Sequence, residues 1–231
     1  MMASRGMIAI VVGLPMLLAG CLDITKDIAF RSNGEARVEV EIALTPQLAA
    51  LMQSPMFDQK SNGKEVPNLL RDCGKPWPAD PPLPAGVRSA ESRRGKRGDM
   101  ETCTMIFDVA DPVKAVEEAQ KMDVPSGENM PKQDFSLVRL DSAPGYRLHA
   151  GFAMPERPPM PPETAKMIEA MMSAMLTGRQ ISVSISAQRI ENTNGELSPD
   201  KRRVTWRLPL ESLVNTPPDK PVSFDADIIY R

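Results

Sequence analysis

Few side chains in this chain of 231 residues are typical of a catalytic centre. A nucleophilic triad needs a histidine, and the sequence contains one, His149. Arg147 and Gly151 share its face of an alternating stretch, so we predict a solvent-facing position on a strand. The chain contains no GxSxG, HExxH or phosphate-binding glycine motif. We therefore assign no catalytic residue and expect no enzymatic activity.

Closely spaced carboxylates are the next chemical feature, because glycan hydrolysis uses two acidic side chains. Asp225 and Asp227 share one face of an expected strand, and the residues between and beside them face the other way: Phe224, Ala226 and Ile228. A half-buried strand has this pattern without any catalytic role. Two more such pairs occur, Asp108 with Asp111 and Asp123 with Glu128. A cell-wall or glycan hydrolase thus remains an alternative function.

Methionine is the residue in excess, with 16 in the chain. Met167, Met171 and Met175 recur every four residues along an expected helix. Such a stripe packs in a core, forms an adaptable groove for apolar ligands, or offers thioethers to Cu(I). Copper sites in exported proteins usually add nearby histidines, and the single histidine of the chain, His149, lies outside the expected helix. We take these three methionines as candidate ligand-binding residues and expect no metal or cofactor.

Cys21 lies at the end of the segment Leu18-Ala19-Gly20-Cys21. A positive Arg5 and the apolar run 7–18 precede it, which is the anatomy of a bacterial lipoprotein signal. The apolar run is far shorter than the roughly 20 residues of a membrane-spanning helix. The pattern predicts removal of residues 1–20 and acylation of Cys21, which would anchor the protein to a membrane facing the periplasm. Leu22, in place of Asp, favours the outer membrane.

The two remaining cysteines, Cys73 and Cys103, are expected to form a disulfide, because an exported chain enters an oxidising compartment. Closing the loop 73–103 would stabilise the fold by about 3 to 4 kcal/mol in the chain-entropy model. This loop contains five closely spaced basic residues: Arg88, Arg93, Arg94, Lys96 and Arg97. We predict a solvated loop that, beside an anionic membrane, gains about 1 kcal/mol per basic residue.

The formal net charge of −2 argues against nucleic acid as a partner. The 23 prolines cluster in loops. Ile24, Lys26, Ile28 and Phe30 alternate as in a strand. Further strands are expected at 38–44, 105–109, 135–140, 146–152, 181–185, 204–208 and 222–229, and helices at 47–53, 113–122, 162–176 and 210–214, with mostly loop over 54–102. This order predicts an α+β fold, an antiparallel sheet of hairpins with helices packed on one face and proline-rich loops.

Asn194-Gly195 predicts a tight turn with positive φ angles, and the strand Val204-Thr205-Trp206 follows it. Together with the N-terminal lipobox, residues 181–224 resemble the C-terminal half of LppM-like bacterial lipoproteins. The family's usual Pro-Gly is replaced here by Ser186-Ala187-Gln188. The resemblance implies an envelope-anchored α+β module that binds lipids or other envelope components without an established enzymatic activity. It carries over no individual functional residue.

The sequence thus predicts a signal peptide over 1–20 and one α+β domain over 21–231. The expected function is that of a non-enzymatic lipoprotein of the cell envelope that binds a lipid, another amphipathic ligand or an envelope partner. A structural subunit of an envelope complex is a further alternative to the hydrolase.

Overall fold

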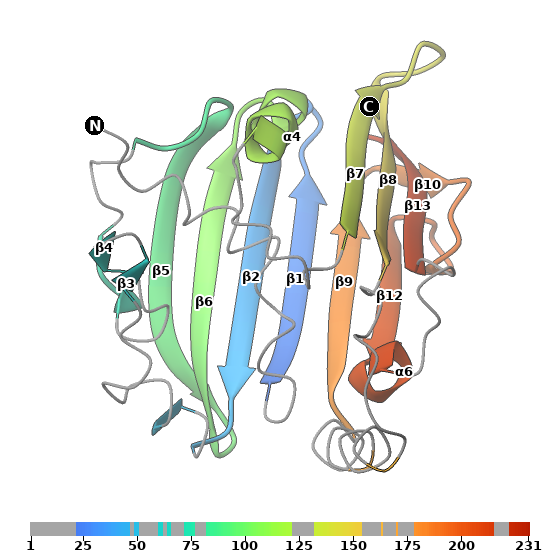
Figure 1. Ribbon diagram of the computed structural model, residues 1–231. Helices are drawn as coiled ribbons and strands as arrows, with labels where there is room; N and C mark the ends of the chain where they lie inside the picture. Colours follow the sequence, from blue (N-terminus) through green and yellow to red (C-terminus); the bar gives the residue numbers. More distant parts are fainter. Residues whose placement is uncertain are drawn as a thin grey trace.

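The computed structural model describes residues 22–46, 49–50, 60–61, 64–65, 72–76, 82–121, 132–153, 163, 170, 178–214 and 222–231. Most of these residues belong to β-strands (Figure 1). Two helices have described bounds, α4 (Pro112–Lys121) and α6 (Leu210–Val214). A small hairpin is formed by β3 (Lys60–Ser61) and β4 (Lys64–Glu65).

The larger sheet has seven strands, in the order β11-β12-β9-β1-β2-β6-β5. Their bounds are β11 (Glu196–Leu197), β12 (Arg203–Pro209), β9 (Gln180–Ser186), β1 (Leu22–Phe30), β2 (Ala36–Leu44), β6 (Met100–Val109) and β5 (Val87–Arg97). The strands pair antiparallel except β1 and β9, which run parallel. The first strand of the chain therefore lies at the centre of the sheet, between its N-terminal and C-terminal halves.

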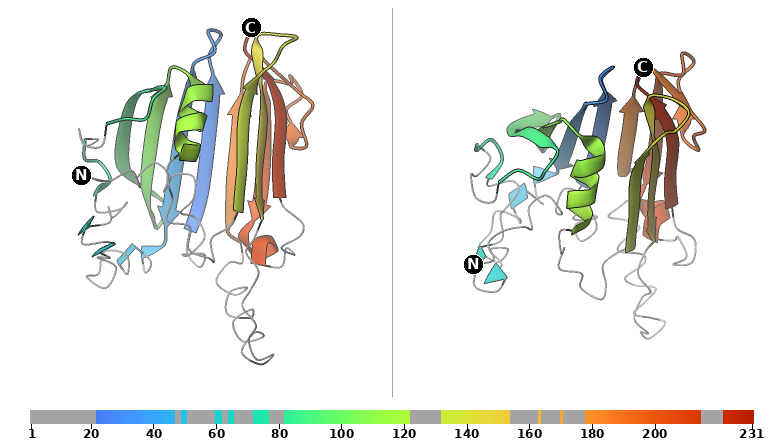
Figure 2. Two further views of the ribbon diagram at one scale, coloured as in Figure 1. Left: turned by 45° about the horizontal axis from the view of Figure 1, so that its top comes forward. Right: turned by 90° about the horizontal axis from the view of Figure 1, so that it is seen from above.

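The smaller sheet is antiparallel and has four strands, in the order β10-β13-β8-β7. Their bounds are β10 (Arg189–Glu191), β13 (Val222–Ile229), β8 (Gly145–Ala153) and β7 (Lys132–Arg139). This sheet forms a second layer beside β9 and β12, and α4 lies next to β7, where Gln120 donates to the carbonyl of Phe135, while Ala115 of α4 faces the apolar cluster on β2 and β6 (Figure 2). The larger sheet thus has different neighbours on its two halves.

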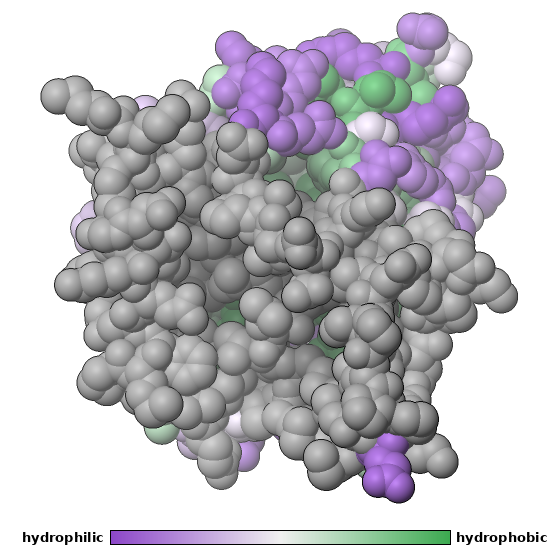
Figure 3. Space-filling view, viewed as in Figure 1, coloured by the Kyte–Doolittle hydropathy of each residue, from purple (hydrophilic) through white to green (hydrophobic). Residues whose placement is uncertain are grey.

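Two apolar clusters hold these layers together. One lies on β2 and β6 and includes Val40, Cys103 and Met105, with Ala115 of α4 packed against it. The other joins the two sheets, with Ile185, Val204 and Trp206 from the larger sheet facing residues of the smaller one: Leu137, Tyr146, Leu148, Ala226 and Ile228. On the face of Figure 3, the described surface is mostly hydrophilic. Among the described residues, Val138 alone is a large hydrophobic residue with an exposed side chain.

The mixed fold is compatible with the expected α+β class, although strands dominate and the described helices are short. The structure differs from the predicted single antiparallel sheet in having two main sheets and the parallel β1–β9 pair. The predicted loop 54–102 was wrong for residues 87–97, because they form β5 and pair with β6, with one irregularity between Val87 and Ser89. Charged residues suit β5 because it is an edge strand. The expected helices 47–53 and 162–176 lie largely outside the described residues.

Candidate site between the sheets

Lys26 projects from the centre of the larger sheet into the space between the two layers. Its register partners are Val40 of β2 and Val183 of β9, and both pack into the apolar clusters. Because side chains alternate along a strand, Lys26 shares its face of β1 with Ile24 and Ile28. Its Nζ lies 5.8 Å from the centre of the Phe135 ring, which belongs to β7 of the smaller sheet. The ammonium group therefore lies between the sheets.

The strand that carries Lys26 is less buried than its position predicts. β1 has three strands on either side, and the inner face of such a central strand is normally the best covered. Yet every residue from Asp23 to Phe30 is half-buried or exposed, whereas β2 and β6 both contain fully buried residues. Val183 and Phe135 beside Lys26 are also half-buried. Solvent therefore reaches apolar side chains around Lys26.

The environment of Lys26 is apolar. Burial lowers the pKa of its amine, because the charged form loses hydration. Among the described residues, no carboxylate lies within ion-pair distance of Nζ. The face of the Phe135 ring supplies partial compensation through a cation–π contact. The Lys26 ammonium group can donate hydrogen bonds to a ligand placed between the sheets, and its positive charge can attract an anion.

The sequence analysis did not select Lys26 as a functional residue. The signal was present in the alternation Ile24, Lys26, Ile28 and Phe30, where a charged side chain takes an apolar position. Without the second layer, this pattern is equally typical of a strand end that reaches solvent.

The outer face of the smaller sheet carries a polar network around two carboxylates. Arg147 donates to both oxygens of Asp227, at 2.7 and 3.1 Å, and Asn192 adds a hydrogen bond of 2.8 Å. Nδ1 of His149 lies 2.6 Å from Oδ1 of Asp225. His149 lies on this outer face, as predicted, and is partly exposed. Asp227 is 6% exposed, so its charge depends on these partners.

The electrostatics of this network follow from its hydrogen bonds. The bond with Asp225 raises the pKa of His149, and the same bond lowers the pKa of Asp225. Hydrogen bonding with Arg147 lowers the pKa of Asp227. A hydrolase needs one carboxyl group that stays protonated as a general acid. Asp225 and Asp227 are both held as anions, which does not favour this chemistry for the pair.

Asn194 links this network to the interior. Its Oδ1 accepts hydrogen bonds from Nε1 of Trp206 at 2.7 Å and from the backbone N–H of Asp225 at 3.0 Å. The predicted tight turn at Asn194-Gly195 was wrong, because the positive φ angles here belong to Asn192 and Lys201. Gly195 serves another purpose, since a Cβ atom there would lie 2.5 Å from Val204 Cγ2 and 2.6 Å from the Trp206 ring. Glycine allows the chain to pass directly over these side chains.

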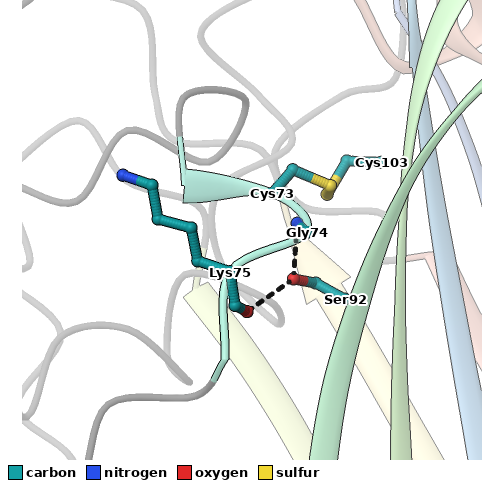
Figure 4. The surroundings of a disulfide bond; sticks show 5 residues. All are labelled: Cys73, Gly74, Lys75, Ser92 and Cys103. Carbon is teal, nitrogen blue, oxygen red and sulfur yellow. Dashed lines mark hydrogen bonds between the residues drawn. A yellow bond between two sulfur atoms is a disulfide. The ribbon is translucent and has the colours of Figure 1, made fainter.

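The structure contains a disulfide between Cys73 and Cys103, the pair expected from the sequence. Next to it, the backbone N–H of Gly74 donates to Oγ of Ser92 at 2.9 Å, and this hydroxyl donates to the carbonyl of Lys75 at 3.4 Å (Figure 4). These bonds hold residues 72–76 against β5 and β6. An open hollow of about 460 Å³ lies beside them, lined in part by Pro76 and Leu83.

The basic residues of β5 have acidic neighbours within the fold. Arg88 pairs with Glu35, and Arg93 with Glu91 at 2.8 Å. Arg97 pairs with Asp23 at 3.0 Å and with Glu41 at 3.3 Å. These three arginines are exposed, as the sequence predicted, but they belong to strand β5 and not to a loop, and each lies within an ion pair.

The other predicted site residues, Cys21, Met167, Met171 and Met175, lie outside the described residues. Within the described ranges, no group of three or more His, Cys, Asp or Glu side chains could hold a metal ion. No helix in the described part of the chain is long and apolar enough to cross a membrane.

Comparison with known proteins gave one structural likeness. The chain is similar to the folded domain of Mycobacterium tuberculosis LppM, known from an NMR structure, with 13% sequence identity and a TM-score of 0.46. The likeness covers 92% of this chain and 91% of that domain. No family model matches the sequence, and no curated protein matches it. A likeness at this level supports no statement about function.

Proposed function

We propose that this chain is an exported, non-enzymatic lipoprotein of the cell envelope that binds an amphipathic ligand between its two sheets. One observation carries the binding part of the proposal. The central strand of the larger sheet, β1, has no fully buried residue between Asp23 and Phe30.

Half-exposed apolar side chains at this position favour a ligand. Ile24 and Ile28 pack against the apolar clusters but remain half-buried, as do Val183 and Phe135 from the facing strands. An acyl chain laid over them would replace water on both surfaces, at about 0.8 kcal/mol for each buried CH₂ group. A ligand with an apolar tail is thus the natural occupant of this space.

A filling substitution tests this binding site. Ile24→Trp places a large ring in the proposed site, whereas Ala29→Trp places the same ring on the exposed outer face of the same strand. Binding of decanoate and 1-decanol to the mature chain, measured by titration calorimetry, should weaken at least tenfold in Ile24→Trp and stay unchanged in Ala29→Trp. Thermal unfolding confirms that both variants fold. Equal binding to the wild type and to Ile24→Trp would contradict the proposal.

The anchor is tested separately. Cys21→Ser removes the acyl acceptor, so the variant should take up no labelled fatty acid and should leave the membrane fraction. Separation of the two membranes by density tests the outer-membrane assignment in the wild type. Undiminished acyl labelling of Cys21→Ser would refute the anchor and leave the ligand proposal untouched.

A further inference from the structure

We propose that the ligand carries an anionic head group, a carboxylate or a phosphate, and that the Nζ atom of Lys26 binds it. This inference rests on the proposed function and specifies the class of amphiphile that the site accepts.

The placement of Lys26 is the first argument. On the same face of β1, the neighbouring side chains Ile24 and Ile28 lie about 7 Å away on either side, two strand residues from Lys26. Across the strand, its partners are Val40, which is 2% exposed, and Val183. A single cation is therefore surrounded by apolar groups on its own sheet.

The second argument concerns what satisfies this cation. An ammonium group that leaves water needs a partner of opposite charge or several hydrogen bonds. Phe135, on the opposite layer, presents the face of its ring and no hydrogen-bond acceptor of comparable strength. Arg147 shows the contrast, because it donates to both carboxylate oxygens of Asp227. No described carboxylate is a comparable partner of Lys26. Within the described residues, the fold supplies no anion to the Lys26 ammonium group.

The third argument is the length of the side chain and its accessibility. Lys26 is half-buried as a residue and its amine is desolvated, so a molecule that enters between the sheets would meet the ammonium group in apolar surroundings. A carboxylate or phosphate oxygen would accept a charge-assisted hydrogen bond there, in surroundings that strengthen it relative to water. The tail of the same molecule would then contact Ile24 or Ile28. Charge and apolar surface thus match the two ends of an anionic amphiphile.

The experiment compares four probes with the same ten-carbon tail: decanoate, decyl phosphate, 1-decanol and decyltrimethylammonium. Calorimetry on the wild-type mature chain should show at least tenfold tighter binding of one or both anions than of 1-decanol, and the weakest binding for the cation. The ratio of decanoate to decyl phosphate affinity then separates a carboxylate ligand from a phosphate ligand.

Two substitutions assign this preference to Lys26. Lys26→Met keeps the length and removes the charge, so anions and 1-decanol should bind alike. Lys26→Arg should retain the preference for anions. Lys96→Met is the matched control, because it removes a lysine from exposed β5 of the same sheet and should change nothing.

The outcomes separate the two proposals. Equal affinity of the wild type for anions and 1-decanol would overturn the role of Lys26 and leave the amphipathic site intact. Retention of the anion preference in Lys26→Met would also overturn it. Failure of all four probes to bind would overturn the proposed function together with this inference. The wild-type series needs no variant, so the test holds even if a substitution impairs folding.

Discussion

The outer face of the smaller sheet and the space between the sheets differ in whether a charged side chain has partners of opposite charge. Asp227 is buried on the outer face and receives hydrogen bonds from Arg147 and Asn192. Lys26 faces the Phe135 ring between the sheets, with no described carboxylate in range. A charge whose partners belong to the fold contributes to stability, whereas a charge without one is available to a ligand. Substitutions in the two regions should therefore have opposite consequences.

The largest effect is expected for Asp227→Ala. It should lower the free energy of unfolding by about 3 kcal/mol, because the buried Asp227 carboxylate loses its charge-assisted hydrogen bonds with Arg147 and Asn192. Urea unfolding measures this loss. Glu191, the register neighbour of Asp227 on β10, pairs with Arg189 at the surface and is the control. Its change to Ala should cost less than about 1 kcal/mol, and equal losses would remove the distinction between the two carboxylates.

The next effect is expected for Asn194→Ala. The indole N–H of Trp206 loses its acceptor, so unfolding free energy should fall by about 2 kcal/mol. A double-mutant cycle with Trp206→Phe isolates this bond, and the coupling energy should be about 1 kcal/mol. A coupling near zero would show that Asn194 acts through Asp225 and Ser223 instead, whose contacts it also makes.

A smaller effect of opposite sign is expected for Lys26→Met. Since no partner is lost and an apolar side chain replaces a desolvated cation, unfolding free energy should rise by about 1 kcal/mol. Lys96→Met, at an exposed position, should lie within about 0.5 kcal/mol of the wild type. Destabilisation by Lys26→Met would mean that the ammonium group already contributes to the fold, and the contrast with Asp227 would fail.

The smallest effect is a pH dependence of the His149–Asp225 pair. The pKa of His149 is raised above its ordinary value of 6.5, so the pair stabilises the fold fully below that pH and loses its contribution as pH rises through the folded-state pKa. The stability difference between the wild type and His149→Gln should therefore shrink from pH 6 upwards. Both side chains are partly exposed, which keeps the difference small. A difference that grows with pH would contradict this assignment.

The sequence was sufficient to predict which face of a strand a side chain occupies, because this depends on alternation within that strand alone. Alternation alone placed His149, Asp225 and Asp227 on the outer face of the smaller sheet, with Ala226 and Ile228 facing inward. It failed for β5, because charged residues and Gly95 obscure the alternation and the pairing with β6 determines the strand. It also failed for Asn194-Gly195, where the approach of Trp206 outweighs local turn preference.

The candidate site could not be predicted from the sequence, because it depends on contacts between distant strands. Lys26 becomes unusual only when β7 brings Phe135 over it and β9 takes its place beside β1. Both contacts join residues far apart in the chain. By contrast, the cysteine pairing was predictable, because the expected acylation of Cys21 leaves two thiols, which offer one intramolecular bridge.

The parallel pairing of β1 with β9 also governs how the molecule can reach its folded state. Ile24 lies opposite Ile181 and Ala29 opposite Ser186, so the first strand completes its pairing only after most of the chain is present. Contacts of this range slow folding to the millisecond-to-second regime typical of topologically complex β proteins. A chain exported N-terminus first would hold one edge of β1 open until residues 180–186 follow. The arrival of that late segment, and not the early β1–β2 hairpin, would set the moment at which the sheet closes.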